Sequence, residues 1–144
     1  MAHTAYVYGG RLMTMFPDVI TIINTVNNKG IKTYNYTVVS GVLFENTKRN
    51  IQKEYGVDDA GSKMCYIPLR VIRDIYVDEV TYKSLSDEAK PNYVTLQKGD
   101  YIVNGIATGV DVNDLYNTFN EVLKITSIDY LLRGSLEHFE VMGA

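Results

Sequence analysis

The hydrophobic and polar positions of this chain alternate in short runs, and few of them follow a helical period. Residues 19–26 (VITIINTV) are rich in β-branched side chains, which is typical of a strand. Residues 32–44 alternate tyrosine and valine with polar residues, and this period of two indicates a half-buried antiparallel strand. A polar turn that ends at Gly30 separates the two runs, so the pattern predicts a β-hairpin.

Shorter strands are predicted along the rest of the chain, at 64–69, 93–96, 100–104, 122–129 and 136–142. Pro68 confines its strand to a sheet edge or to a strand end, because proline has no amide hydrogen to donate. Gly41 indicates a bulge or a bend near the end of the second long strand. The aliphatic run at 71–80 fits either a strand or a loop.

Helical signals are few and short. Residues 84–90 (SLSDEAK) begin like a helix but stop at Pro91, which allows one or two turns at most. Residues 111–120 (DVNDLYNTFN) are the best helix candidate, because apolar side chains near helical spacing follow a capping aspartate. The chain is therefore predicted to be mainly β, a small barrel or sandwich of about six to eight short antiparallel strands with one or two short helices.

The pattern also predicts how the chain is divided. Residues 1–15 show no regular period and contain a Gly-Gly pair, which favours an N-terminal arm or extension. A single domain of ordinary size then spans residues 16–144. Residues 45–63 (ENTKRNIQKEYGVDDAGSK) are polar, and we expect a long exposed loop of the kind that carries function or becomes ordered on binding.

Composition narrows the class of protein mainly by exclusion. A chain of 144 residues with 46% hydrophobic and 22% charged residues is ordinary for a globular protein. Its net charge of −3 argues against a dedicated nucleic-acid binder, although a protein that surrounds DNA without gripping it remains compatible. The single cysteine excludes an internal disulfide, and no apolar run approaches the ~20 residues that cross a bilayer. We therefore expect folding in a reducing cytoplasm and no membrane partner.

Tyrosine is unusually frequent, with twelve residues and no tryptophan. Tyrosine combines a large apolar face with a polar tip and is enriched at protein–protein interfaces. It is also favoured on half-buried sheet faces. The tyrosines therefore fit a surface for protein contacts or an ordinary β-sheet.

One segment has the glycine spacing of a phosphate-binding loop, residues 56–63 (GVDDAGSK). In the working motif a lysine directly follows the second glycine, whereas here Ser62 precedes Lys63. Asp58 and Asp59 would repel phosphates, and no strand and long helix flank the segment. The spacing therefore does not predict a nucleotide site.

A cysteine and two histidines are the remaining candidates for catalysis or metal binding. Cys65 with His3 or His138 would form a thiol–imidazole pair. However, Cys65 lies in an apolar run, where a free cysteine usually packs as a small buried side chain. The three residues are too far apart in sequence for a zinc motif, and Asp111 fits a helix cap better than a calcium loop. We expect no catalytic residue, no metal site and no cofactor.

An ordered set of short motifs occupies the second half of the chain: YIPL at 66–69, TLQKGDYIVNG at 95–105, LKITSID at 123–129 and RGSLEHFEV at 133–141. This order resembles a family of small prophage proteins of Gram-positive bacteria that are encoded among the head–tail connector genes. It is similar, more loosely, to the head-closure (stopper) proteins of long-tailed phages. With the hairpin, the resemblance covers about Asp18 to Val141. The chain departs from the family in having Phe139 where tryptophan is common, and in its N-terminal arm.

The resemblance implies a structural protein of the virion and not an enzyme. It implies a β-barrel-like subunit that forms a closed ring, expected to be a hexamer, between the portal or adaptor and the tail-terminator or tail-tube proteins. Such a ring is assembled in the host cytoplasm and encloses DNA at the head–tail junction without sequence-specific binding. Carboxylates do not hold phosphates, so we expect Glu54, Asp58 and Asp59 on the predicted loop to face the DNA channel or a partner.

Three other interpretations remain open. The first is a tail terminator or another tail-proximal ring protein, which the partners of the purified oligomer would distinguish. The second is a small phage-encoded enzyme with a polar pocket around Cys65 or His138, in which Cys65→Ala would abolish activity. The third is a host regulatory β domain, which does not account for the ordered motifs.

Overall fold

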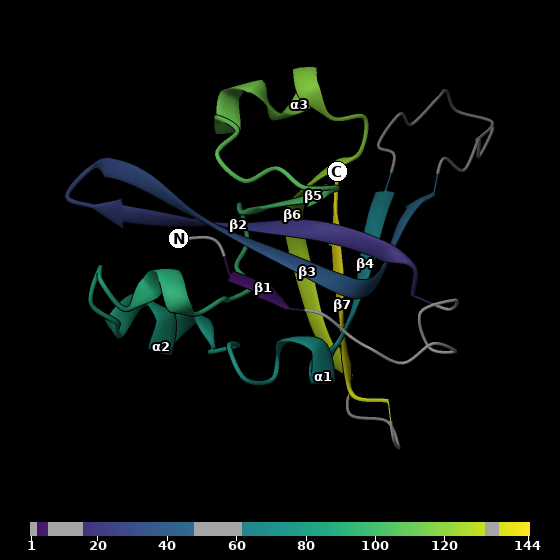
Figure 1. The fold of residues 1–144 in the computed structure, drawn as a ribbon, viewed down its shortest axis with the longest axis horizontal. Coiled ribbons are helices and arrows are strands. Elements are labelled where there is room, and N and C mark those ends of the chain that lie inside the picture. The colour runs from purple at the N-terminus through teal and green to yellow at the C-terminus, as the bar shows by residue number, and fades with distance from the viewer. Residues whose placement is uncertain (1–2, 6–15, 48–61, 132–135) are drawn as a thin grey trace, which may run out of the picture.

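The protein is a β-sheet that closes on itself, as Figure 1 shows. The computed structural model describes residues 3–5, 16–47, 62–131 and 136–144. The strands are β1 (His3–Ala5), β2 (Asp18–Asn28), β3 (Ile31–Thr47), β4 (Ser62–Pro68), β5 (Tyr101–Asn104), β6 (Val122–Leu131) and β7 (His138–Gly143). Their order is β1-β3-β2-β5-β6-β7-β4, and β4 also pairs with β3. The six antiparallel strands β2 to β7 thus form a closed ring, and β1 runs parallel to β3 outside it. The prediction of a mainly β protein is confirmed.

The hairpin of β2 and β3 forms as predicted. Its two turn residues, Lys29 and Gly30, have φ values of 52° and 87°, and positive φ at both central positions matches the right-handed twist of the flanking strands. Further along β3, the pairing with β2 passes directly from Ser40 to Val42. Gly41, with φ of 79°, is therefore the extra residue of a bulge, and the predicted bend is confirmed.

Two long strands give the ring two walls. The first part of β3 pairs with β2, and residues 43–47 pair with β4. In the same way, residues 122–124 of β6 pair with β5, and residues 125–131 pair with β7. One wall consists of β2, β5 and the start of β3, and the other of β4, β7 and the end of β6. Because β4 is paired on both sides, Pro68 stands at a strand end and not at a sheet edge.

Aliphatic and aromatic side chains from both walls fill the interior. Inward residues alternate with outward ones along each strand, as the pleat requires. A short helix, α1 (Leu69–Ile72), follows β4 directly and adds Val71 and Ile72 to this core. The core also includes Ile20, Ile22, Val39, Val42, Phe44, Cys65, Ile67, Ile102, Leu123, Ile125, Phe139 and Val141.

The helix predicted at 111–120 is present as the 3-10 helix η2 (Val112–Asp114) followed by α3 (Leu115–Thr118). The Asp111 carboxylate accepts a hydrogen bond from the Asn113 amide over 2.9 Å, as expected of a capping residue. Among the residues described, no helix is long and apolar enough to cross a membrane.

Between β4 and β5 the prediction was wrong in three places. Residues 71–80, expected to be strand or loop, contain the end of α1 and the start of α2 (Glu79–Ser84). The Asp78 carboxylate caps α2 by accepting a hydrogen bond from the Thr81 amide at 2.7 Å. The helix expected at 84–90 is therefore placed earlier, and the 3-10 helix η1 (Lys90–Asn92) follows it. Residues 93–96 contribute one parallel bridge to Tyr76 and no strand.

The long loop was also predicted with the wrong ends. Residues 45–47 continue β3, and Ser62 and Lys63 begin β4. Asn46 pairs across the strands with Lys63 and Thr47 with Ser62, while Glu45 pairs with Met64. The backbone ladder that closes the ring outweighs the polar character of these side chains. The rest of the predicted loop, residues 48–61, lies outside the described residues.

Candidate functional site

The acidic residues predicted to face a channel or partner were Glu54, Asp58 and Asp59. All three lie outside the described residues, so this assignment stays a prediction. The remaining candidates for a catalytic or binding site lie on the two walls and at the tip of the hairpin.

The structure does not bring Cys65 and His138 together as a thiol–imidazole pair. Cys65 is fully buried in the core, and this burial raises the pKa of its thiol, which keeps the thiol protonated. His138 pairs across the strands with Pro68, three positions along β4. Its ring contacts Leu136 O at 3.0 Å and Glu140 Oε1 at 3.3 Å. Within the described ranges, no group of three His, Cys, Asp or Glu side chains is arranged to hold a metal ion.

The outer face of β2, β5 and the start of β3 is covered by the chain's own residues 105–119, and we call it the covered wall. Leu115 of α3 is fully buried against Ile23 and Val103 of this face. Hydrogen bonds hold the cover at its first residue, Gly105, and near its middle, at Val110. The Thr21 hydroxyl donates to Gly105 O at 2.8 Å, and the Tyr36 hydroxyl donates to a backbone carbonyl of the cover at 2.6 Å. The strands of this wall are therefore covered by the chain itself, and the cover exposes Ile106 and Tyr116 on its own outer side.

A buried polar network lies beside the core where β2 meets residues 94–100. The side-chain amide of Asn24 donates to Thr95 O at 2.7 Å and to Asp100 Oδ2 at 3.0 Å, and its Oδ1 accepts from the Thr95 amide at 3.1 Å. The other carboxylate oxygen of Asp100 accepts from the Thr25 amide at 3.1 Å. Gln97 donates to the Thr25 carbonyl at 3.1 Å. The network attaches this segment to β2.

Asp100 is a buried carboxyl group without a cationic partner among the described residues. Removal from water raises its pKa, and the hydrogen bonds from Asn24, Gln97 and Thr25 offset only part of this effect. Its polar atoms are engaged by neighbouring groups of the same chain. We therefore assign it a structural role in the network.

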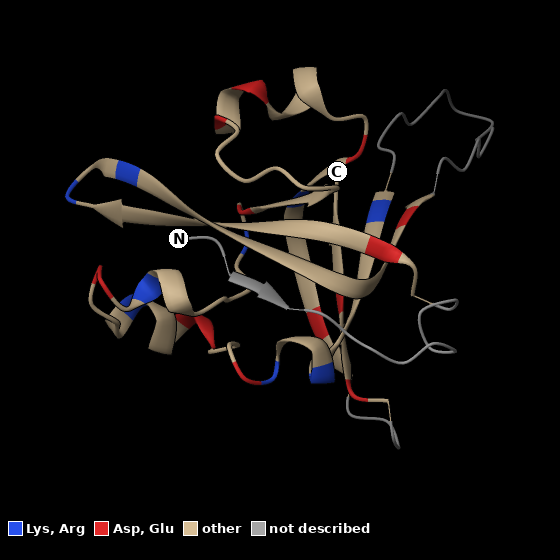
Figure 2. Ribbon diagram, in the orientation of Figure 1, with Lys and Arg blue, Asp and Glu red and all other residues tan. Residues whose placement is uncertain are grey.

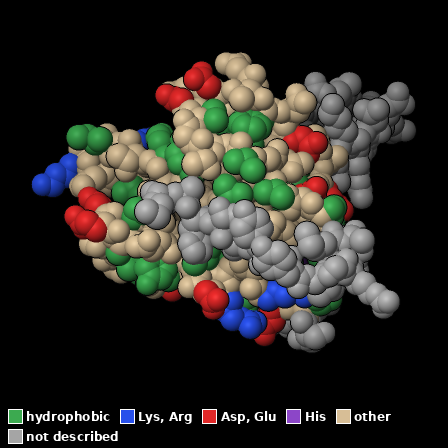
Figure 3. All heavy atoms as spheres, viewed as in Figure 1, with side chains coloured by type: hydrophobic (Ala, Val, Ile, Leu, Met, Phe, Trp, Pro, Cys, Tyr) green, Lys and Arg blue, Asp and Glu red, His purple; other side chains and the backbone are tan. Residues whose placement is uncertain are grey.

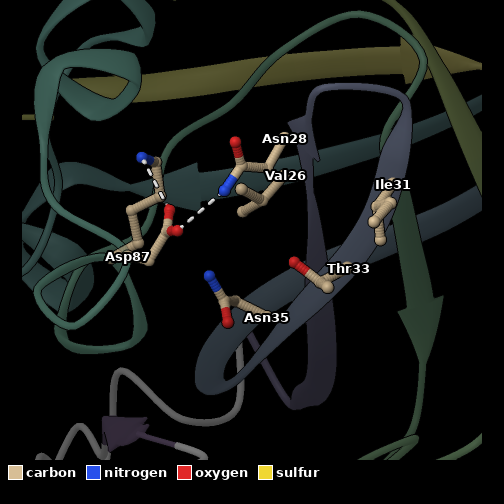
Figure 4. A pocket seen from close by; sticks show the side chains of 7 residues that line it. Val26, Asn28, Ile31, Thr33, Asn35 and Asp87 are labelled. Carbon is tan, nitrogen blue, oxygen red and sulfur yellow. Dashed lines mark hydrogen bonds and ion pairs between the residues drawn. The ribbon is translucent and has the colours of Figure 1, made fainter.

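Two adjoining cavities lie between the hairpin and the segment from α2 to η1. Their volumes are about 410 Å³ and about 260 Å³, and both are lined by Val26, Asn28, Asp87 and Lys90. Figure 4 shows the smaller one, where the Asn28 amide donates to Asp87 Oδ2 at 3.0 Å. The Lys90 ammonium donates to Leu85 O at 2.5 Å and lies 3.7 Å from Asp87 Oδ1. These contacts between Asn28, Asp87 and Lys90 hold the base of the hairpin to the α2–η1 segment. The charges of Asp87 and Lys90 are therefore already paired and are not free to bind a ligand.

The outward face of β4, β7 and residues 125–131 of β6 is different, and we call it the open wall. Cys65 and Ile67 of β4 point into the core, so the alternating positions Met64 and Tyr66 point outward. Across the ladder, Met64 pairs with Met142, which is 37% exposed. The described residues form two buried apolar clusters, the core and the one under the 105–119 cover. Neither cluster covers the open wall.

Two carboxylates stand directly opposite each other on the open wall. Asp129 of β6 pairs across the strands with Glu140 of β7, and like charges in this position destabilise a sheet. In the described part of the chain, neither forms an ion pair with a Lys or Arg; Glu140 contacts His138 at 3.3 Å. The nearest lysine on β4, Lys63, follows the inward alternation and donates to Val122 O at 2.7 Å. The open wall is thus partly apolar and acidic.

The tip of the hairpin (residues 29–32) has the opposite charge. Lys29 and Lys32 are the only charged residues between positions 19 and 44 of the sequence. Between them Ile31 is 70% exposed, a large value for an isoleucine. Figure 2 shows Lys and Arg in blue at the hairpin end of the ribbon, on the left of the molecule, and Figure 3 shows hydrophobic side chains near the blue ones on the surface. The tip is therefore cationic and apolar.

Neither the hairpin tip nor the open wall was identified as a site from the sequence. The absence of acidic residues from 19–44 was a usable signal for the tip. The open wall had no comparable signal, because Asp129 and Glu140 become neighbours only through the register of β6 against β7.

The chain belongs to a family of unknown function, DUF6751, whose model matches residues 16–144. No curated protein and no solved structure matches the chain.

Proposed function

We propose that this DUF6751 member is a structural subunit of the neck of a tailed bacteriophage, a head–tail connector or head-closure protein that forms a ring between portal and tail. The observation that carries the proposal is where the four resemblance motifs lie. Their described residues fall on or directly next to β4, β5, β6 and β7, and residues 133–135 of the fourth motif lie outside the described residues. In the ring these strands are consecutive neighbours, in the order β5-β6-β7-β4. The motifs therefore specify one continuous part of the fold.

The surface of the subunit supports this proposal. A closed ring of copies needs two different, complementary patches on each subunit, because its contacts are head-to-tail. The hairpin tip and the open wall differ in both charge and element. Each exposes a large apolar side chain, Ile31 and Met142 respectively. Exposed apolar side chains together with charged ones are typical of surfaces that bind protein.

The charge of the chain is compatible with a ring around DNA. At a net charge of −3 the subunit does not attract phosphates, so DNA can pass without being retained on the wall. The proposal still assigns Glu54, Asp58 and Asp59 to the channel or to a partner surface. Equal DNA packaging and ejection by phages carrying their neutral variants would count against a channel position.

The direct test is to locate the protein in assembled particles. A peptide tag after Ala144 is introduced into the phage, and the purified virions are labelled with a tag-specific gold conjugate and imaged by electron microscopy. We expect label at the head–tail junction of each particle. Label along the tail, at the tail tip, or absent from particles overturns the proposal. Co-purification with portal-side proteins supports a connector, and co-purification with tail-tube proteins alone supports a tail terminator.

A further inference from the structure

We propose that the hairpin tip of one subunit docks on the open wall of a second copy of this chain. The inference names the two surfaces of the ring contact, and it rests on the ring-forming function proposed above. The occupant of the open wall is thus residues 29–32 of a neighbouring subunit.

Charge complementarity is the first argument. The open wall has Asp129 and Glu140 side by side without a Lys or Arg partner among the described residues. The hairpin tip has Lys29 and Lys32 in a stretch that contains no acidic residue. Two lysines brought to two adjacent carboxylates remove the repulsion within each patch, and complementary patches also select the correct partner.

Apolar complementarity is the second argument. Ile31, at 70% exposure, lies between the two lysines. On the open wall, Met64 and Met142 pair across β4 and β7 beside the carboxylates. Methionine side chains adapt to the shape of an inserted group. The contact therefore has an apolar centre with charges around it, the usual anatomy of a protein interface.

The positions of the two patches favour a ring over a symmetric dimer. In Figure 1 the hairpin projects to the left end of the long axis, while β4 and β7 lie toward the opposite side. Because the tip and the wall are far apart on one subunit, each subunit uses one patch toward each neighbour. Repeating such a head-to-tail contact gives a ring when the rotation closes.

The test uses charge reversal on the full chain. The tip variant is Lys29→Glu/Lys32→Glu, and the wall variant is Asp129→Lys/Glu140→Lys. Self-association is measured by sedimentation velocity and negative-stain imaging, and circular dichroism with thermal unfolding verifies that each variant is folded. We expect each variant to self-associate about tenfold or more weakly than the wild type.

The matched control is Lys83→Glu/Lys98→Glu, which makes the same change in net charge at exposed lysines outside the hairpin tip. It should assemble like the wild type. A chain that carries both reversals, tip and wall, should regain assembly because the charges are complementary again. This rescue separates a direct contact from a general effect of charge or a folding defect.

The outcomes distinguish this inference from the proposed function. If the wild type forms rings and the tip variant forms them equally well, the docking surfaces are wrong and the neck function stands. The same conclusion follows if the tip variant assembles but loses binding to a portal-side or tail-tube protein, since the tip then binds another partner. Failure of the doubly reversed chain to assemble, or a wild type that stays monomeric at all concentrations, also overturns the inference. Virions without label at the neck overturn the function itself.

Discussion

The two walls of the ring differ in how their polar and charged side chains are partnered. Every buried polar or charged side chain of the described residues belongs to β2, β3 or residues 90–100: Thr21, Asn24, Thr37, Ser40, Lys90, Thr95, Gln97 and Asp100. Most of these bond to segments that pack on the covered wall or beside the core. On the open wall the inward side chains are mostly apolar, and the inward Lys63 donates to Val122 O. Its outward carboxylates have no Lys or Arg partner within the described ranges, and Glu140 contacts His138. One wall is covered by residues 105–119, and among the described residues no segment covers the other in the same way.

Chain connectivity explains the cover on the first wall. The connection between β5 and β6 spans residues 105–121, which is long enough to fold back over the wall that β5 belongs to. The connection between β6 and β7, residues 132–137, is shorter, and residues 132–135 of it lie outside the described residues. The cover therefore forms where the connection allows it.

The largest effect is expected from breaking the network beside the covered wall. Asn24→Ala removes three buried hydrogen bonds and leaves Asp100 and the Thr95 backbone short of partners. We expect the free energy of unfolding to fall by about 4 kcal/mol, because unsatisfied buried groups cost more than the bonds contribute. Chemical denaturation measures it. Asn28→Ala, on the same strand, is the matched control. It removes one exposed hydrogen bond, to Asp87 Oδ2, and should lower the free energy of unfolding by about 1 kcal/mol or less, because water can replace that bond. Equal effects of the two variants would contradict a special role for the network.

The next effect tests the cover itself. Leu115→Ala opens a hole under the cover and should lower the free energy of unfolding by about 3 kcal/mol. Met142→Ala on the open wall should change the stability of the subunit by about 0.5 kcal/mol or less, because its side chain is 37% exposed. Thermal unfolding of dilute protein compares the two. A loss of similar size at Met142 would show that the open wall is covered in the isolated subunit.

The strands of both walls could be predicted from local sequence, whereas the charge pattern of the open wall could not, because it depends on the pairing of β6 with β7. The alternation around Tyr34 and Tyr36 predicted a strand with one buried face, and both tyrosines pack under the cover. Gly30 and Gly41 marked the turn and the bulge correctly. These features depend on residues that are close in sequence, so they can be recognised without knowledge of the fold.

The failures come from contacts between distant residues. The polar character of residues 45–47 and 62–63 indicated a loop, whereas pairing between β3 and β4 makes them strand. The sequence pattern predicted a helix at 84–90, whereas the structure has a helix at Glu79–Ser84 that Asp78 caps. The hydrogen bond of this cap decides the position of so short a helix more than its weak hydrophobic periodicity does. The candidate docking surfaces were missed for the same reason, since the register of β6 and β7 places Asp129 beside Glu140.

A smaller, pH-dependent effect sharpens the contrast between the buried carboxyl of the network and the outward-facing ones of the open wall. Burial raises the pKa of Asp100 above its ordinary value of 3.8. The neutral form is thus favoured in the folded state, so this group stabilises the fold most below its ordinary pKa. That contribution is lost as the pH rises through the raised pKa. We expect a carbon-detected NMR titration to place the Asp100 midpoint above 3.8; a midpoint at or below that value would show that the hydrogen bonds outweigh burial.

The smallest effect is expected from a substitution on the open wall. We expect it to stabilise the isolated subunit and to weaken self-association. Asp129→Asn removes one of two facing carboxylates. In the monomeric Lys29→Glu/Lys32→Glu background it should raise the free energy of unfolding by about 0.5 kcal/mol, since the cross-strand repulsion disappears. In the wild-type background the same change should weaken self-association, because the hairpin lysines lose one partner. Chemical denaturation measures the first effect and sedimentation velocity the second. A loss of stability in the monomer would mean that Asp129 already has a cationic partner within its own subunit, and the open wall would then have no unmet charge to offer a neighbour.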